Sequence, residues 1–242
     1  MTERDHPVSF SLQIRKMFSA IAPRYDLLNR LLSCGQDRYW RKVAVKKVSP
    51  QPDSLWLDLA TGTGDVALEM ARRYKSKNLR IVGVDFSLPM LALAGKKLIA
   101  QNPAGTIHLQ AGAGENLAFR GGSFDGITIA FGIRNFSDML LGLKEMRRVL
   151  NTGGKLIILE FSFPKNIMLK FIYRLYFDWL LPVIGRIISG HRIAYGYLSA
   201  SVSDFPVRER FVQIMEEAGF KNISYMDLTF GIVTLYIGYK DV

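Results

Sequence analysis

Cysteine and histidine are scarce in this chain of 242 residues. Cys34 is the only cysteine, which excludes an intramolecular disulfide and a cysteine-rich zinc site and favours a reducing compartment. The three histidines, His6, His108 and His191, are scattered without the spacing of metal ligands, so we predict no metal. The N-terminal stretch has no apolar run of the kind that a secretory signal contains, so we expect no such signal.

Acidic residues are also few. The chain has 32 Lys and Arg residues against 21 Asp and Glu, a net charge of +11. Residues 1–50 account for +6 of this charge and residues 161–200 for +4, so the middle of the chain is close to neutral. Basic charge placed so unevenly suggests an acidic partner, either nucleic acid or an anionic membrane surface. Solvated basic faces with no partner are the alternative.

A long apolar run without charges is absent too. Residues 167–188 are rich in aromatic side chains, but Lys170, Arg174, Asp178 and Arg186 interrupt them. A membrane-spanning helix needs about 20 residues with few or no charges, so this stretch does not qualify. It predicts an interfacial helix or a lid over an apolar cavity, with an ordinary buried helical hairpin as the alternative.

The chain does contain a buried strand, a glycine turn and a helix start in succession. Residues 55–59 are mostly apolar, as in a strand covered on both faces. Gly62 and Gly64 permit positive φ and close approach of a ligand, and we expect Asp65 to be the N-cap of the following helix. Asp85 ends a second apolar strand, where a carboxylate can accept hydrogen bonds from both ribose hydroxyls. Ligands of open α/β sheets bind beyond the carboxyl ends of the strands, so we predict a site for an adenosine-type cofactor.

Two cofactors are compatible with this turn. Residues 62–67 satisfy the dinucleotide pattern G-x-G-x-x-G/A, which permits NAD. Asp58 adds an acid that NAD does not need and that suits the cationic amino-acid end of S-adenosylmethionine, either directly or by fixing the loop backbone. The stretch Leu57-Asp58-x-Ala60-x-Gly62-Thr63-Gly64-Asp65 resembles the signature of class I S-adenosylmethionine-dependent methyltransferases.

Strands and helices alternate along the central part of the chain. We expect strands at 55–60, 80–85, 106–110, 124–131, 155–161, 222–229 and 232–239, and helices at 65–75, 88–100, 138–150 and 207–218. This order predicts an α/β fold with a doubly wound, mostly parallel, Rossmann-like sheet of seven strands and an antiparallel C-terminal hairpin. A class I methyltransferase sheet ends with an antiparallel strand, whereas a six-stranded dinucleotide fold does not, so the hairpin disfavours NAD.

We expect one domain, residues 1–242, with four parts. They are an N-terminal helical cap (1–53), an S-adenosylmethionine-binding core (54–161), a helical lid or membrane-facing insertion (162–205), and a C-terminal helix with the hairpin (206–242). The N-terminal helices are interrupted at Pro23, next to the cluster Tyr25-Asp26-x-x-Asn29, which would place polar and aromatic groups over the site.

Motifs outside the glycine turn are more specific. They are Phe18-Ser19-x-Ile21-Ala22-x-x-Tyr25-Asp26-x-x-Asn29, Asp85-Phe86-Ser87-x-x-Met90-Leu91, Glu115-Asn116-Leu117-x-Phe119, Phe131-Gly132-Ile133-Arg134-Asn135, Tyr195-x-Tyr197-Leu198-x-x-Ser201 and Leu228-Thr229-x-Gly231-Ile232. Together they resemble the quinone-ring C-methyltransferases of menaquinone and ubiquinone biosynthesis, and the resemblance runs from about Phe18 to Lys240.

The resemblance implies S-adenosylmethionine as cofactor and a polyprenyl quinol as substrate. Demethylmenaquinol is the first expectation, and 2-methoxy-6-polyprenyl-1,4-benzoquinol is the alternative. A polyprenyl tail lies in the bilayer, so the enzyme needs a basic, aromatic-rich face and an apolar channel, which residues 1–50 and 161–205 would supply. We therefore expect a cytoplasmic protein associated peripherally with the inner face of the membrane, without a nucleic-acid partner; a homodimer is compatible with the sequence.

The predicted cofactor-binding residues are Asp58, Gly62, Thr63, Gly64, Asp85, Ala113, Gly114 and Ala130. By resemblance, Thr63 stands at the loop threonine and Asp85 at the ribose acid. Ala113 and Gly114 stand where the family has Asn-Ala, and Ala130 replaces a small hydroxyl residue, so only backbone contacts are available there. Asp37 occupies a position that is usually His in the family.

The predicted catalytic residues are Arg134, Asn135 and Tyr25. The reaction needs ring carbon, methyl and sulfur in line, together with loss of a phenolic proton. Arg134 would stabilise the developing phenolate or orient a water, unless it forms a structural pair with an acid such as Glu160. Asn135 would hold a quinol oxygen, and Tyr25 would close over the site together with Asp26.

The general base is unassigned. His191 is a candidate on titration grounds, and a water held by Arg134 is another. Two other functions also stay open, namely methylation of a different substrate such as an RNA base or a sterol, and a non-catalytic scaffold that keeps the fold.

Overall fold

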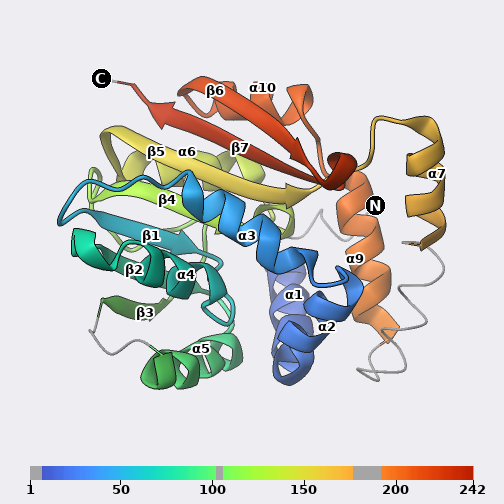
Figure 1. Ribbon diagram of the computed structural model, residues 1–242, viewed down its shortest axis with the longest axis horizontal. Helices are drawn as coiled ribbons and strands as arrows, with labels where there is room; N and C mark the ends of the chain where they lie inside the picture. Colours follow the sequence, from blue (N-terminus) through green and yellow to red (C-terminus); the bar gives the residue numbers. More distant parts are fainter. Residues whose placement is uncertain (1–6, 102–105, 177–191, 242) are drawn as a thin grey trace.

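The computed structural model describes residues 7–101, 106–176 and 192–241. Its centre is one seven-stranded sheet with the strand order β3-β2-β1-β4-β5-β7-β6 (Figure 1). The strands are β1 (Leu55–Leu59), β2 (Arg80–Asp85), β3 (Ile107–Ala111), β4 (Phe124–Ala130), β5 (Leu150–Phe161), β6 (Phe220–Leu228) and β7 (Val233–Lys240). Strands β1 to β5 pair in parallel, and β7 pairs antiparallel with both β5 and β6. The predicted fold class, including the antiparallel C-terminal hairpin, is confirmed.

Helices cover both faces of this sheet. They are α1 (Pro7–Ile21), α2 (Tyr25–Leu32), α3 (Gln36–Lys46), α4 (Asp65–Arg73), α5 (Leu88–Gln101), α6 (Met139–Val149), α7 (Ile167–Leu175), α9 (Arg192–Asp204) and α10 (Glu209–Glu217). Figure 1 shows α3 and α4 on the near face of the sheet and α6 and α10 on the far face. His191 and residues 177–190 of the aromatic stretch lie outside the described residues.

The side chains of β1 explain why helices cover both faces of the sheet. Alternate residues of a strand point to opposite faces. Trp56 packs with α3 and α4 in one buried apolar cluster, whereas Leu57 and Leu59 pack with α6 and α10 in another. A strand that is apolar on both faces is stable only between two layers of helices, and the run of apolar residues at 55–59 therefore specifies a central strand.

The segment between α6 and β5 differs from the prediction. We expected the helix to end at residue 150 and the strand to begin only at residue 155. Helix α6 does end at Val149, but β5 already begins at Leu150 and pairs there with Phe124. Gly153 has a φ of +74°, and the register shifts between Phe124 and Gly126, so the strand absorbs the glycines as an irregularity instead of starting after them.

The carboxyl ends of the parallel strands meet at one edge of the sheet. In Figure 1 the β5 arrow points toward this edge, where α1, α2 and α9 gather. Short 3₁₀ turns, η4 (Ile133–Asn135) after β4 and η6 (Thr229–Gly231) between β6 and β7, lie in the same region. Within the described ranges, none of the helices is both long and apolar enough to cross a bilayer.

Candidate active site

The turn after β1 takes the left-handed backbone that its glycines permit. Gly62 has a φ of +56° and Gly64 a φ of +84°. Gly64 is the residue that precedes α4, so the expectation that Asp65 is the N-cap was wrong. Asp65 is instead the first residue of the helix, where its negative charge is favourable near the helix N-terminus. A side chain at Gly62 would project into open space 4.0 Å from the Tyr25 ring, so the bare backbone leaves a cradle there.

Asp85, at the end of β2, holds this turn in place through hydrogen bonds to the backbone. One carboxylate oxygen accepts the Gly62 N–H at 2.8 Å, and the other accepts the Ser87 N–H at 2.8 Å. Burial raises the pKa of Asp85, against the backbone hydrogen bonds that lower it. Each carboxylate oxygen has a further lone pair, so the same group can also accept hydroxyl hydrogen bonds from a ligand.

Asp58 lies under the turn and lines neither of the two cavities found at this edge of the described structure. Its two oxygens accept hydrogen bonds from the hydroxyls of Thr61 at 2.6 Å and Thr128 at 2.8 Å. Complete burial raises the pKa of Asp58 to about 6. Of the two roles that the sequence left open for Asp58, the geometry corresponds to fixing the loop.

A cavity of about 440 Å³ opens above the glycine turn. We call it the glycine-turn cavity. It is lined by Leu12, Ile14, Arg15, Phe18, Tyr25, Leu59, Ala60, Gly62, Asp85, Phe86, Met90, Gly112, Ala113, Gly114, Glu115, Ala130, Phe131, Gly132, Asn135, Phe136 and Ser137. Five of the eight predicted cofactor residues are in this set, and Asp58, Thr63 and Gly64 are not. Helix α1 supplies the side of the cavity opposite the sheet.

The lining of the glycine-turn cavity fits S-adenosylmethionine. Asp85 offers carboxylate lone pairs for ribose hydroxyls, and Gly62 leaves room for the ligand above the turn. At Gly114 an added Cβ would lie 2.1 Å from the Phe136 ring, so only glycine permits the wall to close at this position. The bound cofactor would supply an electrophilic methyl group.

Thr63 points away from the cavity into a charged cluster. Its hydroxyl donates to Asp26 of α2 at 2.6 Å and accepts from Lys97 of α5 at 2.9 Å. Lys97 also forms ion pairs of 2.6 Å with both Asp26 and Asp65. Burial alone would raise the pKa of Asp65, but Arg41 and Lys97 together hold it below its usual value. The cluster therefore fastens the segment α1–α2 to the glycine turn.

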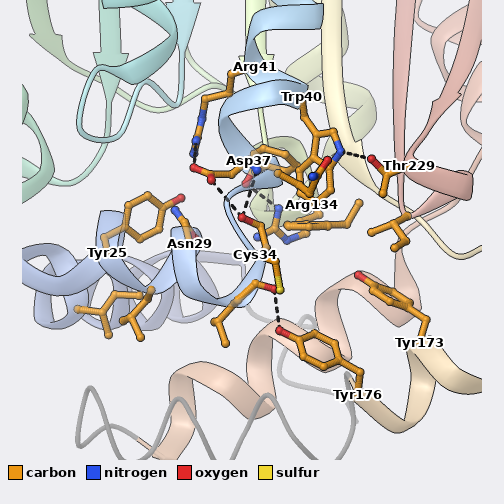
Figure 2. A pocket seen from close by; sticks show the side chains of 18 of the residues that line it. Tyr25, Asn29, Cys34, Asp37, Trp40, Arg41, Arg134, Tyr173, Tyr176 and Thr229 are labelled. Atoms are coloured by element: carbon orange, nitrogen blue, oxygen red, sulfur yellow. Dashed lines mark hydrogen bonds and ion pairs between the residues drawn. The ribbon is translucent and has the colours of Figure 1, made fainter.

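A second cavity of about 340 Å³ adjoins the first, and Phe18, Tyr25 and Phe131 line both. We call it the Arg134 cavity (Figure 2). Its lining residues are Met17, Phe18, Ile21, Tyr25, Leu28, Asn29, Leu32, Ser33, Cys34, Gln36, Asp37, Trp40, Arg41, Phe131, Arg134, Phe161, Tyr173, Tyr176, Tyr197, Thr229 and Ile232. Most of these side chains are apolar or aromatic, and the charged ones are few.

Arg134 forms the pair with Glu160 that the sequence had left as an alternative. Its Nη1 donates to Glu160 at 2.6 Å and to the Phe131 carbonyl at 2.7 Å, and Glu160 is fully buried. Burial raises the pKa of Glu160, while the Arg134 charge lowers it. The buried Nε of Arg134 has no hydrogen-bond partner. The pair fixes the guanidinium in the cavity wall, where it can still meet a ligand oxygen.

Aromatic rings and a second ion pair complete this end of the cavity. Phe131 and Phe161 lie with their ring centroids 4.6 Å apart, and the indole N–H of Trp40 donates to Thr229 at 2.7 Å. Asp37 is buried, accepts a hydrogen bond from Arg41 and is also bonded to the Ser33 hydroxyl at 3.0 Å. These contacts provide flat apolar surfaces beside a few fixed polar groups.

The predicted catalytic residues divide between the two cavities. Arg134 lines the Arg134 cavity, Asn135 lines the glycine-turn cavity, and Tyr25 stands in the wall between them. The Asn135 side-chain oxygen accepts a hydrogen bond of 3.0 Å from the Tyr197 hydroxyl, which comes from α9. The turn η4 thus presents neighbouring residues to both cavities.

Two groups near the site were missed from the sequence. Lys97 follows Met90 and Ala94 at helical spacing, and both of these are buried, so a lysine on that face was a signal of an internal ion pair. The second is the aromatic wall of Trp40, Phe131 and Phe161, which no local pattern distinguishes from ordinary core.

Comparison with known proteins supports one family. Residues 7–240 match the model of the ubiE/COQ5 methyltransferase family. The chain is 51% identical over 228 residues to the ubiquinone/menaquinone biosynthesis C-methyltransferase UbiE of Geotalea daltonii, covering 94% of this chain and 96% of that protein. It is 45% identical over 227 residues to the demethylmenaquinone methyltransferase of Deinococcus radiodurans, covering 94% and 92% of the two chains.

Solved structures agree on the fold. A SAM-dependent methyltransferase of Thermotoga maritima superposes with a TM-score of 0.65 at 19% identity, covering 93% of this chain and 99% of that one. Phosphoethanolamine N-methyltransferase 2 of Haemonchus contortus, in complex with S-adenosyl-L-methionine, gives 0.63 at 15% identity over 84% of this chain and 52% of that one. The family match extends over nearly the whole chain, so the protein is an S-adenosylmethionine-dependent enzyme and belongs to the ubiE/COQ5 methyltransferase family.

Proposed function

We propose that this chain transfers a methyl group to a ring carbon of a polyprenyl quinol, with demethylmenaquinol as the substrate and menaquinol as the product. The alternative within the same reaction is 2-methoxy-6-polyprenyl-1,4-benzoquinol of ubiquinone biosynthesis. Some relatives carry the name UbiE and others are named demethylmenaquinone methyltransferase, and these names are compatible with either quinol ring as the substrate.

The observation that carries the proposal is the pair of adjoining cavities. The glycine-turn cavity fits the cofactor, and the Arg134 cavity beside it is largely apolar with Arg134, Asp37 and Arg41 at its buried end. A quinol has this same combination of a flat apolar ring and two oxygens. Phe131 belongs to both cavities, so a ring against it lies next to the cofactor.

Arg134 is proposed to act on the quinol oxygen. Loss of the phenolic proton places negative charge on that oxygen and raises the electron density at the neighbouring ring carbon. This carbon would take the methyl group as the bond between methyl and the cofactor sulfur breaks, and the ring would then lose its own hydrogen as a proton. A guanidinium already held by Glu160 and the Phe131 carbonyl needs little reorganisation to stabilise this charge. Asn135 and Tyr25 are proposed to orient the substrate, because they stand in the walls next to the cofactor.

The decisive experiment is methyl transfer from labelled S-adenosylmethionine. Demethylnaphthoquinol and methoxy-benzoquinol with short prenyl tails are offered under reducing conditions, and Asp85→Ala serves as the cofactor-binding control. We expect label in at least one quinol and none with the variant. Cofactor binding without turnover on either quinol would overturn the assignment of a quinol substrate and favour a non-catalytic scaffold. An RNA substrate would be tried next.

We also propose that the protein associates with the cytoplasmic face of an anionic membrane through α7. Ile167, Phe171 and Ile172 of this helix are 85%, 64% and 56% exposed. Lys170 lies between these side chains in the sequence, Arg174 follows Ile172, and Lys165 precedes the helix. Exposed apolar side chains interleaved with basic ones are typical of helices that lie in the membrane interface.

Sedimentation with vesicles tests the membrane proposal. We expect binding to vesicles with anionic lipid, less to purely zwitterionic vesicles, and loss of binding when Ile167, Phe171 and Ile172 are all changed to Ser. Changing the exposed Leu88 and Ile99 of α5 to Ser is the matched control. Equal sedimentation of all three proteins would contradict the role of α7.

A further inference from the structure

The Arg134 cavity reaches the surface along one rim. Among the described residues that line it, Cys34 and Gln36 are exposed, whereas Asp37, Arg41 and Arg134 are only 4%, 8% and 7% exposed. Cys34 lies in the connection between α2 and α3, and Gln36 is the first residue of α3. The cavity therefore has a closed polar end and an opening at this connection.

The other side of the opening is formed by the end of α7. Tyr176 directly follows the last residue of α7. Its hydroxyl donates a hydrogen bond of 2.7 Å to the carbonyl of Leu32, the last residue of α2. Figure 2 shows Cys34 beside this hydrogen bond, and Arg41 at the far side of the view from Tyr176. The rim thus lies between α2 and α7, with Cys34 at its edge.

The size of the cavity limits how much of a polyprenyl quinol it can hold. Ligand pockets range over roughly 300–1,000 Å³. At about 340 Å³ this cavity is near the lower limit, enough for a ring and the first part of a tail. The ring must lie against Tyr25 and Phe131 to adjoin the cofactor, so the remaining tail has to leave by another side.

Apolar side chains continue from this rim over the surface. Leu31 of α2 precedes Leu32 by one residue and is 49% exposed, and α7 exposes Phe171 and Leu175. Covering such side chains with a hydrocarbon chain removes apolar area from water, which is favourable at about 25 cal/mol per Å². Of the described sides of the cavity, the rim is the one where an exposed lining residue lies next to exposed apolar helix faces.

We propose that the prenyl tail of the substrate leaves the Arg134 cavity between α2 and α7, past Cys34, and continues over Leu31 and α7 toward lipid. The inference rests on the proposed function, because it takes a tailed quinol as the ligand. It adds a tail-binding surface whose chemistry is that of an isoprenoid hydrocarbon.

Cys34 provides the test without any mutation, since it is the only cysteine of the chain. The folded protein is labelled at Cys34 with a methylthio group or with a bulky aromatic maleimide. Methyl transfer is then measured on a tail-less demethylnaphthoquinol and on the same ring with four isoprene units. We expect the bulky label to lower kcat/KM for the tailed quinol at least tenfold and for the tail-less quinol less than twofold, with little effect of the methylthio label.

The possible outcomes separate the two proposals. Equal loss on both quinols, or no loss on either, overturns the tail path while leaving quinol methylation intact. Failure of the unlabelled protein to methylate either quinol overturns the proposed function itself.

A substitution gives an independent check of the same path. Leu31→Gln should raise KM several-fold for the tailed quinol and leave the tail-less quinol unchanged. Leu141→Gln on α6 is the matched control, because Leu141 is similarly exposed, at 46%, on a helix remote from the rim. An equal effect of both substitutions would contradict a tail path over α2.

Discussion

Lys97 of α5 and Asp26 of α2 form an ion pair of 2.6 Å that joins the sheet-bound core to the segment α1–α2. Lys97 makes a second pair of 2.6 Å with Asp65, and the Thr63 hydroxyl bonds both Lys97 and Asp26. One ammonium group therefore holds two carboxylates that belong to different layers. Because α1 lines the glycine-turn cavity, we expect this contact to influence how firmly a bound cofactor is enclosed.

Replacing Lys97 should loosen that enclosure. In Lys97→Met the two carboxylates face each other without a shared cation, and α1–α2 should separate from the glycine turn. We expect the Kd for S-adenosylmethionine to rise roughly tenfold, because hydrogen bonds to charged groups contribute about 1.5–3 kcal/mol. Calorimetric titration measures the affinity, and limited proteolysis shows whether residues 7–32 become accessible.

Lys96→Met is the control for Lys97, since Lys96 is the exposed neighbour on the same helix. Adding Asp26→Asn to Lys97→Met should recover part of the affinity by removing one of the opposed charges. If Lys97→Met bound the cofactor as tightly as the native chain, the charged cluster would have no part in holding the segment α1–α2.

Gly114→Ala should weaken cofactor binding through Phe136. The added Cβ would lie 2.1 Å from the Phe136 ring, so the ring must move and the cavity wall with it. We expect a loss of about 1–3 kcal/mol in the free energy of unfolding, as in other overpacked sites, and at least a tenfold rise in the Kd for S-adenosylmethionine. Urea denaturation and calorimetric titration measure the two effects.

Gly95→Ala is the matched control for Gly114, because a Cβ at this position of α5 meets nothing within 4 Å. Alanine is the better helix former, so the control should gain about 0.5–1 kcal/mol of stability and keep its cofactor affinity. Comparable losses in both variants would contradict the contact with Phe136.

Arg134→Lys should separate charge from geometry. Nη1 alone binds both Glu160 and the Phe131 carbonyl, and a lysine that kept these contacts would have no second nitrogen to meet the quinol oxygen. We expect kcat to fall by about 100-fold or more with a smaller change in cofactor affinity. Arg147→Lys, at an exposed pair with Asp241, is the control and should keep full turnover. Full turnover in Arg134→Lys would exclude the proposed role of the guanidinium.

Asp58 predicts a pH dependence of stability. Its pKa is about 6 in the folded chain against 3.8, the ordinary value of an aspartate, so the folded state binds more protons between these pH values. The free energy of unfolding therefore falls as pH rises from about 4 to about 6, by about 3 kcal/mol for a shift of about two units. In Asp58→Asn this contribution disappears, which urea denaturation at several pH values measures.

Asp53→Asn is the control for Asp58, since Asp53 is an exposed aspartate next to the start of the same strand. It should show the pH profile of the native chain. If Asp58→Asn also kept that profile, Asp58 would be charged across this range in both states.

Local sequence patterns predicted the parts of the site that depend on the backbone. The apolar run of β1, the glycines at 62 and 64 and the acid at the end of β2 each have a local physical reason, and the strand order then brings them to one edge. The antiparallel pairing of β6 and β7 followed in the same way from two strands joined by a short connection. Family motifs spread along the chain added the reaction, because such motifs report residue identity and need no geometry.

What the sequence by itself determined, then, is the fold class, the cofactor and the family. Only the tertiary structure decided that Thr63 bonds Asp26 instead of facing the cofactor cavity, that Arg134 is paired with Glu160, and that Lys97 joins two layers. The physical reason is the same in each case. Charged and hydroxyl groups choose partners by distance in space, and these partners lie 26 to 71 positions apart in the chain, where no periodicity or local spacing can connect them.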